Sequence, residues 1–249
     1  MKYDGIDFSD IEQKYHSLEK YIQQMALGNL RSLIVNGPPG VGKTYSTSSY
    51  LKKYSSQKQT TITGHMTNFK LYVELYRHKS AEQILILDDV DSVMSDVKGL
   101  NILKGAMDTG ESREINWESS TTLLSALNVP TSFHFKGGVI LITNTGFGGG
   151  SKKHISHLNA LKDRSYCLHL GDRDQETVFR YICYAITQRD ILKEYKLSES
   201  QKFVILEFIE QHMYSMHSLS LRSLVKCAEL MCIDPINWKD LALNGLVKV

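Results

Sequence analysis

The sequence predicts an α/β fold in which a mostly parallel sheet lies between layers of helices, followed by a small all-α domain. Between residues 32 and 170, apolar runs of strand length alternate with helical segments. That alternation favours a parallel sheet with helices on both faces. The run at 84–87 is apolar throughout, and the run at 138–143 has a polar side chain only at Thr143, which is typical of strands buried on both faces. After Gly171 the pattern changes, and helical segments continue without a convincing strand.

The expected elements can be placed in order along the chain. Residues 10–27 carry apolar side chains at helical spacing, and Gly28 is suited to end that helix. Strands are expected at 32–36, 60–63, 84–87, 138–143 and 166–170. Helices are expected at 45–54, 67–78, 100–107, 173–191, 198–213, 219–232 and 237–245. The polar stretch 108–130 has no clear assignment apart from one arm of a short hairpin at 114–117.

The length of the chain bounds its domain organisation. With 249 residues, of which 42% are hydrophobic, it can bury one large core and a smaller satellite domain. We expect an N-terminal helix and linker over residues 1–28, an αβα core over 29–171 and a helical domain over 172–249.

Composition limits the partners and the compartment. The net charge of +2 predicts neither a strong nucleic-acid field nor an acidic tail, so any DNA-binding surface would be a local patch. The four cysteines form no C-x-x-C pair, which favours a reduced, cytosolic compartment. No segment resembles a signal peptide or the run of about 18 apolar residues that spans a membrane. We therefore expect a soluble cytoplasmic protein, in the host cytoplasm if it is viral, with no membrane partner.

Residues 37–44 match the phosphate-binding loop pattern G-x-x-x-x-G-K-[ST] in full. The loop consists of Gly37, Pro38, Pro39, Gly40, Val41, Gly42, Lys43 and Thr44. Its glycines let backbone N–H groups curl around a phosphate chain. In this pattern Lys43 reaches the β- and γ-phosphates, and the Thr44 hydroxyl can ligate Mg²⁺. The helix expected after the loop would point its N-terminus at the anion.

Polar side chains end two of the predicted strands. Asp88 follows the apolar run 84–87, where a carboxylate beside a phosphate loop is placed to hold Mg²⁺ directly or through water. Asp89 comes next and would polarise the attacking water. Asn144 follows the strand 138–143 and would position that water and sense the γ-phosphate.

Together, GPPGVGKT at 37–44, ILILDDVDSV at 84–93 and ILITN at 140–144 resemble the AAA+ ATPase family. The overall pattern is similar to small ATPases encoded by bacteriophages. The resemblance runs from residue 30 to residue 232. It implies a P-loop NTPase αβα core with a helical lid, ATP and Mg²⁺ as cofactors, and ATP hydrolysis.

The resemblance also implies roles for two arginines. Arg164, in the segment ALKDRS, looks like an arginine finger that reaches in trans into a neighbouring subunit's site. Arg222, in the segment SLRSL, looks like the sensor-2 arginine of the lid, which contacts the γ-phosphate of its own subunit's ATP. An arginine that acts in trans requires a homo-oligomer, commonly a closed ring of about six subunits in this family.

One position departs from the family pattern. The second motif usually reads Asp-Glu, whereas this chain has Asp88-Asp89, and aspartate is one methylene shorter. The outcomes that remain open are competent hydrolysis, slow, switch-like turnover, and a scaffold that binds ATP without hydrolysing it. Competent hydrolysis is favoured because the other expected catalytic positions are filled.

The load on which ATP hydrolysis would act is also open. We favour a nucleic acid or nucleoprotein, as in replication, recombination or helicase loading, over a polypeptide threaded by a protein-remodelling unfoldase. Phe69 is either a pore-loop contact or, as its spacing favours, part of the core face of a helix. Trp117 either stacks on bases or packs inside the protein. The glycine-rich stretch 146–153 is expected to be a loop.

Overall fold

The computed structural model describes residues 3, 5–54, 58–110, 113–118, 122–144 and 151–248. The chain divides into two compact units. The sheet unit contains Tyr15–Asn36 and Lys43–His169, and the helical unit contains Met1–Lys14, Gly37–Gly42 and Leu170–Val249. The boundaries expected after residues 28 and 171 stay predictions. Across the described ranges, no helix combines the length and the apolar character needed to cross a membrane.

Within the described residues, five parallel strands form the main sheet in the order β2-β3-β6-β1-β7. They are β1 (Ser32–Asn36), β2 (Lys58–Thr63), β3 (Gln83–Asp88), β6 (Gly138–Thr143) and β7 (Tyr166–His169). Their carboxyl ends are in register, because Asn36 pairs with both Thr143 and His169, and Asp88 pairs with Ile142. The predicted αβα fold with a mostly parallel sheet is confirmed.

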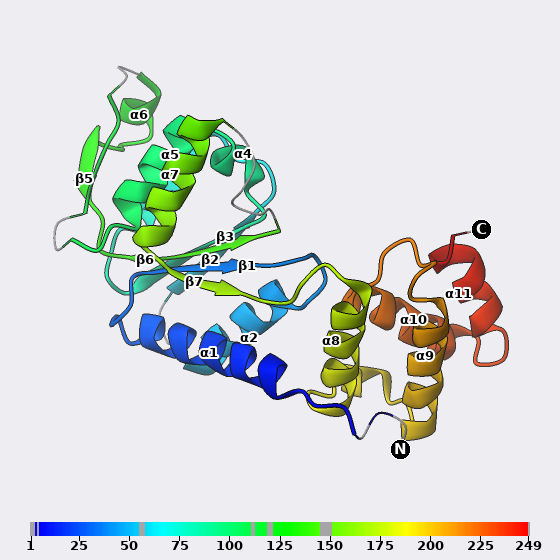
Figure 1. The fold of residues 1–249 in the computed structure, drawn as a ribbon. Coiled ribbons are helices and arrows are strands. Elements are labelled where there is room, and N and C mark those ends of the chain that lie inside the picture. Colours follow the sequence, from blue (N-terminus) through cyan, green and yellow to red (C-terminus); the bar gives the residue numbers. More distant parts are fainter. Residues whose placement is uncertain are drawn as a thin grey trace. The chain divides into compact units, whose positions relative to one another are not determined.

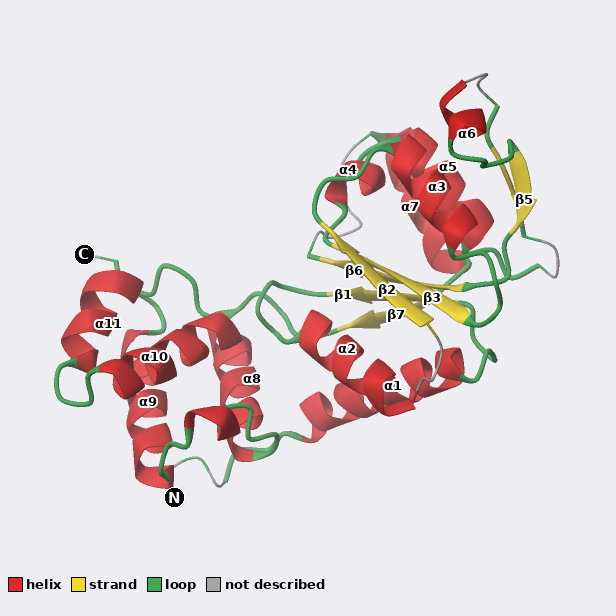
Figure 2. Ribbon diagram, turned by 180° about the vertical axis from the view of Figure 1, so that it is seen from behind, coloured by secondary structure: helices red, strands yellow, loops and turns green. Residues whose placement is uncertain are grey.

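Helices cover both faces of this sheet (Figures 1 and 2). One face carries α2 (Lys43–Tyr54) and residues 15–26 of α1 (Ser9–Ala26). The other carries α3 (Asn68–Arg77), α5 (Val97–Ala106) and α7 (Lys152–Asp163), and the short α4 (Asp91–Met94) packs against α5.

The core explains why the strands read as continuous apolar runs. Leu85 and Leu87 of β3 join the cluster beneath α3, α5 and α7, together with Val139 and Leu141 of β6. Successive side chains of a strand alternate between faces, so the buried Ile86 and its neighbours turn toward α1 and α2. Both faces of the sheet are therefore apolar.

A small insertion lies between α5 and β6. Strand β4 (Glu114–Asn116) pairs antiparallel with β5 (Ser132–His134), and α6 (Thr122–Ala126) lies between them in sequence. The hairpin arm expected at 114–117 therefore has a partner. Trp117 packs edge-on to Phe69 and tilted against Tyr72, with ring centroids 5.8 and 5.4 Å apart. Both aromatic residues whose role the sequence left open thus pack against the core cluster.

The helical unit contains α8 (Gln175–Thr187), α9 (Glu199–His212), α10 (Leu221–Ile233) and α11 (Trp238–Leu246), with a 3₁₀ turn at Lys193–Tyr195. Polar side chains fix where these helices begin. Ser198 and Ser220 each form a capping box at the start of α9 and α10. The first residues of the chain also belong to this unit, since the Tyr3 hydroxyl donates to Glu210 over 2.7 Å.

The sequence analysis does not anticipate α4, α6, α7 or β5. For α7 the reason is local, because the glycine-rich stretch before it reads as loop. Residues 145–150 of that stretch lie outside the described residues, but Ser151 caps α7 by accepting from His154 N, and Lys152 and Lys153 are helical. The expected loop 146–153 is therefore wrong at its last two residues.

Candidate functional site

The glycines of the 37–44 loop occupy positions that other residues cannot. Gly37 has φ of 150°, and a Cβ there would lie 2.0 Å from Leu170 O. Gly40 has φ of 79°, and a Cβ there would lie 2.2 Å from Ser220 Cβ. The carbonyl of Gly40 also accepts from Leu221 N over 2.8 Å. Within the helical unit, the loop therefore lies directly against the start of α10.

Lys43 opens α2 in the sheet unit and is buried, with 5% of its surface exposed. Its ammonium group donates to Asn144 Oδ1 over 2.6 Å. Asn144 follows β6, so the two residues meet at the carboxyl edge of the sheet. A buried ammonium group at this edge can bind an anionic oxygen.

Thr44 and Asp88 meet at the same edge. The Thr44 hydroxyl donates to Asp88 Oδ2 over 2.8 Å, and Asp88 ends β3 with only 5% of its surface exposed. A hydroxyl and a carboxylate are both hard oxygen donors, the kind that Mg²⁺ prefers. The donor set therefore fits the magnesium ion that the sequence predicts.

Asp89 has an unusual backbone. Its φ is 54°, in the left-handed region, and its N–H donates to Ile142 O over 3.0 Å. This turn aims its side chain at Asn144, whose Nδ2 donates to Asp89 Oδ1 over 2.7 Å. Aspartate tolerates the left-handed region better than most residues. The result is a continuous chain of side chains from Lys43 through Asn144 to Asp89.

Strand order explains why residues distant in sequence meet here. Strand β6 lies between β3 and β1, so Asn144 lies between the aspartates that end β3 and the lysine that follows β1. Of the predicted site residues, the structure brings together Lys43, Thr44, Asp88, Asp89 and Asn144. A carboxylate close to an ammonium group and to a pair of hard oxygen donors can accept a proton from water next to a bound phosphate.

Arg164 lies at the opposite end of the sheet, beside the amino-terminal end of β1. It follows α7 and precedes β7, and its carbonyl accepts from the hydroxyl of Ser32, the first residue of β1. Ser32 is four residues before Asn36, which corresponds to about 13 Å along the strand. The guanidinium Nε of Arg164 donates to Asp108 Oδ2 over 3.1 Å. Arg164 is thus separated from the Lys43–Asn144–Asp89 chain of side chains of the same molecule.

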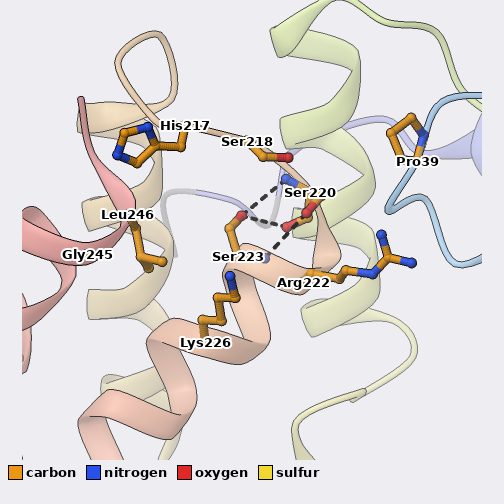
Figure 3. Close-up of a pocket in the computed structure, with 9 residues that line it drawn as sticks. All are labelled: Pro39, His217, Ser218, Ser220, Arg222, Ser223, Lys226, Gly245 and Leu246. Atoms are coloured by element: carbon orange, nitrogen blue, oxygen red, sulfur yellow. Dashed lines mark hydrogen bonds between the residues drawn. The ribbon is translucent and has the colours of Figure 1, made fainter.

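Arg222 belongs to the helical unit and lines a pocket of about 140 Å³. Figure 3 shows its side chain extending toward Pro39 of the loop, while Lys226, one turn later on α10, extends toward Ser223. The pocket is lined by Pro39, His217, Ser218, Ser220, Arg222, Ser223, Lys226, Gly245 and Leu246. Within this unit, the guanidinium group of Arg222 is therefore placed to bind a phosphate that lies near the loop.

Two residues that lie beside these arginines, Asp108 and Lys226, were not predicted from the sequence. Asp108 pairs with Arg164 across 56 residues, and no sequence signal marks that pairing. Lys226 repeats the cation of Arg222 at a spacing of four, which places both on one helix face and was readable from the sequence.

The segment that carries the site residues from Lys43 to Asn144 also resembles known proteins. Residues 33–147 match the model of the AAA family, described as the ATPase family associated with various cellular activities. The chain is also 29% identical, over 259 residues, to an uncharacterised 36.7 kDa protein from the nrdC-mobD intergenic region of Enterobacteria phage T4. That similarity covers 97% of this chain and 79% of the phage protein.

Solved structures share the fold. Domain III of the Thermotoga maritima replication initiation protein DnaA superposes with a TM-score of 0.56 at 13% identity, covering 100% of this chain and 96% of that one. The Thermotoga maritima RuvB Holliday junction branch migration motor superposes with a TM-score of 0.52 at 12% identity, covering 94% and 68%. At these identities the superpositions show a common fold.

Proposed function

We propose that this chain, whose residues 33–147 form an AAA+ P-loop ATPase domain, binds ATP with Mg²⁺ and hydrolyses it. The observation that carries the proposal is the chain of side chains from Lys43 through Asn144 to Asp89, beside the Thr44–Asp88 pair. These residues supply a cation for phosphate oxygens, two oxygen ligands for a metal and a carboxylate for water.

Each residue has a distinct task in this proposal. Lys43 binds phosphate oxygens, while Thr44 and Asp88 hold Mg²⁺. A magnesium ion held by Thr44 and Asp88 would supply positive charge that neutralises the charge developing during phosphoryl transfer. Asn144 orients Asp89, and Asp89 accepts a proton from the attacking water. The pocket beside the loop supports Arg222 as a contact to the γ-phosphate.

A slow, switch-like ATPase is the second candidate, and one contact favours it. The carboxylate of Asp89 already accepts a hydrogen bond from Asn144, which lowers its basicity and leaves fewer acceptor sites for a water. Because aspartate is shorter than glutamate, a proton relay through a second water would slow turnover further. We favour competent hydrolysis, since the other expected catalytic positions are filled.

The position of Arg164 supports an oligomer. The length of β1, about 13 Å, separates Arg164 from the carboxyl ends of the strands, where Asp88, Asp89 and Asn144 lie. One side chain cannot cross that distance. A second copy of the chain, in a head-to-tail contact, would bring Arg164 to the neighbour's nucleotide. We propose a homo-oligomeric ring in which Arg164 stabilises charge in trans.

We propose nucleic acid or nucleoprotein as the load. Proteins that share the fold include a Holliday junction branch migration motor and a replication initiation protein, which supports this choice. A protein-remodelling machine remains the alternative.

The deciding experiment is an ATPase assay on protein of known oligomeric size, with and without single- and double-stranded DNA. We expect Mg²⁺-dependent turnover that Asp88→Ala abolishes and that DNA stimulates, with stimulation weakening as salt rises. Turnover no higher than that of Asp88→Ala would contradict hydrolysis. Stimulation by unfolded protein without any response to DNA would replace the proposed load with a polypeptide.

A further inference from the structure

Two nitrogens of the Arg164 guanidinium group donate hydrogen bonds within the protein. Its Nε donates to Asp108 Oδ2 over 3.1 Å, and its Nη1 donates to Ala160 O over 2.8 Å. Among the described residues, Nη2 makes no hydrogen bond. The side chain is 36% exposed. Two of the three guanidinium nitrogens are thus fixed to the protein, and Nη2 is left for an acceptor from outside the subunit.

Asp108 is itself fixed. Its Oδ1 accepts from Gly110 N over 2.9 Å, which closes a turn just after α5 and leaves Oδ2 for Arg164. The backbone hydrogen bond from Gly110 lowers the pKa of Asp108, and the charge and hydrogen bond of Arg164 lower it further. Arg31 Nη1 donates to Gly110 O over 3.2 Å, so the turn is held from its far side as well.

A buried hydroxyl connects the two segments that carry this pair. Ser32 Oγ, in a residue only 5% exposed, lies 2.9 Å from Arg164 O and 3.4 Å from Met107 O. The backbones of residues 107 and 164 therefore meet at the first residue of β1. Asp108 and Arg164 are brought together by the core of the sheet unit, and not by two mobile side chains that happen to meet.

A second cation, Lys104, lies close enough to Arg164 to interact with it. Lys104 lies on α5 with its Nζ 2.8 Å from His157 Nδ1 on α7. Burial lowers the pKa of Lys104, and the charge of Arg164 lowers it further, so the two cations repel each other. Without the Asp108 carboxylate, this repulsion would favour other rotamers of Arg164.

We propose that Asp108 is a positioning residue, which holds the Arg164 guanidinium with its Nη2 nitrogen directed at a phosphate oxygen of a nucleotide bound by a second copy of this chain. This inference rests on the proposed role of Arg164 in trans. Asp108 does not itself touch the nucleotide. It fixes the orientation of the group that does, as positioning residues do in preorganised sites.

The test begins with Asp108→Asn, which keeps the size of the side chain and can still accept from Gly110 N. An exposed ion pair has a small energy, so we expect kcat for ATP to fall about 2- to 5-fold with KM unchanged. The ratio of wild-type to variant kcat should shrink at high salt, which screens the pair. Asp10→Asn is the matched control, because it removes the Asp10–Arg180 pair, whose side chains are 52% and 35% exposed. Its kcat should stay at the wild-type value.

Mixing experiments separate positioning from a structural role. Asp108→Asn subunits mixed with an excess of Lys43→Ala subunits receive an intact Asp108–Arg164 pair from each neighbour. Their turnover per active subunit should therefore match that of wild-type subunits mixed in the same way. Added to Arg164→Ala, the Asp108→Asn change should lower kcat no further.

Three outcomes would overturn the inference. Wild-type kcat for Asp108→Asn would show that the pair does not position Arg164. A deficit that persists in excess Lys43→Ala would place the effect inside the mutated subunit. Full activity of Arg164→Ala would remove the trans role itself, and the inference with it. The first two outcomes leave the proposed function intact, so the two failures are distinguishable.

Discussion

Asn144 donates a hydrogen bond from its side-chain amide to the carboxylate of Asp89 over 2.7 Å, across 55 positions of sequence. The oxygen of the same amide accepts from Lys43. These two partners fix the orientation of the amide, because only Nδ2 can donate to a carboxylate and only Oδ1 can accept from an ammonium group. Lys43 and Asp89 are therefore linked through a group that must be both donor and acceptor.

An Asn144→Asp change keeps the shape of the side chain and removes the donor. Its carboxylate would face that of Asp89, and repulsion between like charges would displace the proposed base. We expect single-turnover hydrolysis to fall about 100-fold or more, while the affinity for ATP, measured by nucleotide titration, changes less. Asn29→Asp is the control, since Asn29 donates over 2.8 Å to Gln24 at an exposed site. Hydrolysis by Asn144→Asp within a few-fold of wild type would contradict the role given to this amide.

Substitutions of Asp89 can test two features: its left-handed backbone conformation and the proposed role of its carboxylate. At φ of 54°, asparagine is tolerated and glutamate is not favoured. We therefore expect Asp89→Asn to keep wild-type stability, bind ATP and lose hydrolysis. Asp89→Glu, which restores the usual family residue, should lower the free energy of unfolding by about 1 kcal/mol. Chemical denaturation and nucleotide titration of both variants provide the measurements. An Asp89→Glu protein as stable as wild type would show that the turn relaxes, and that strain does not oppose the longer side chain.

The sequence predicted most of the sheet unit because its signals are local. The continuous apolar runs of β3 and β6 and the loop at 37–44 can each be recognised without knowing what lies beside them. Helix α7 was missed because residues 146–150 and the lysines after Ser151 read as loop, although Ser151 is a good cap. Strand β5 is only three residues long and gains its definition from pairing with β4.

The contacts of the site could not be predicted in the same way. The Asp89–Asn144 contact depends on β6 lying beside β3, which is a matter of strand order and not of local pattern. The left-handed backbone of Asp89 depends on its N–H reaching Ile142 O on the neighbouring strand. Trp117 shows the converse: its aromatic character suggested base stacking, whereas tertiary contacts with Phe69 and Tyr72 settle its role in the fold.

The two cations of the pocket beside the loop should differ in effect. In Figure 3 Arg222 extends toward Pro39, and Lys226 lies one turn further along α10. Arg222→Ala should weaken ATP binding about tenfold or more, since it removes a hydrogen bond to a charged phosphate, and should leave ADP binding unchanged. Lys226→Ala is the matched control on the same helix face and should change ATP affinity less than about threefold. Calorimetric titrations with ATP and ADP distinguish the two variants. Equal losses for both nucleotides in Arg222→Ala would contradict a contact to the γ-phosphate.

Gly40→Ala should uncouple the loop from α10. Two effects act together: alanine is strained at φ of 79°, and its Cβ would lie 2.2 Å from Ser220 Cβ. The loop or Ser220 must shift, and the hydrogen bond from Leu221 N to Gly40 O is lost. We expect the free energy of unfolding to fall by about 2 kcal/mol.

Gly245→Ala provides the comparison within the same unit. Gly245 lies in α11, and a Cβ added there would meet nothing within 4 Å, so alanine should raise the free energy of unfolding by about 0.5–1 kcal/mol. Thermal unfolding with and without Mg²⁺ and ATP measures both effects. Nucleotide should raise the Tm of wild type and Gly245→Ala, because it binds the folded state, and should fail to do so for Gly40→Ala. A Gly40→Ala protein that nucleotide stabilises as strongly as wild type would show that the phosphate-binding conformation does not require glycine at this position.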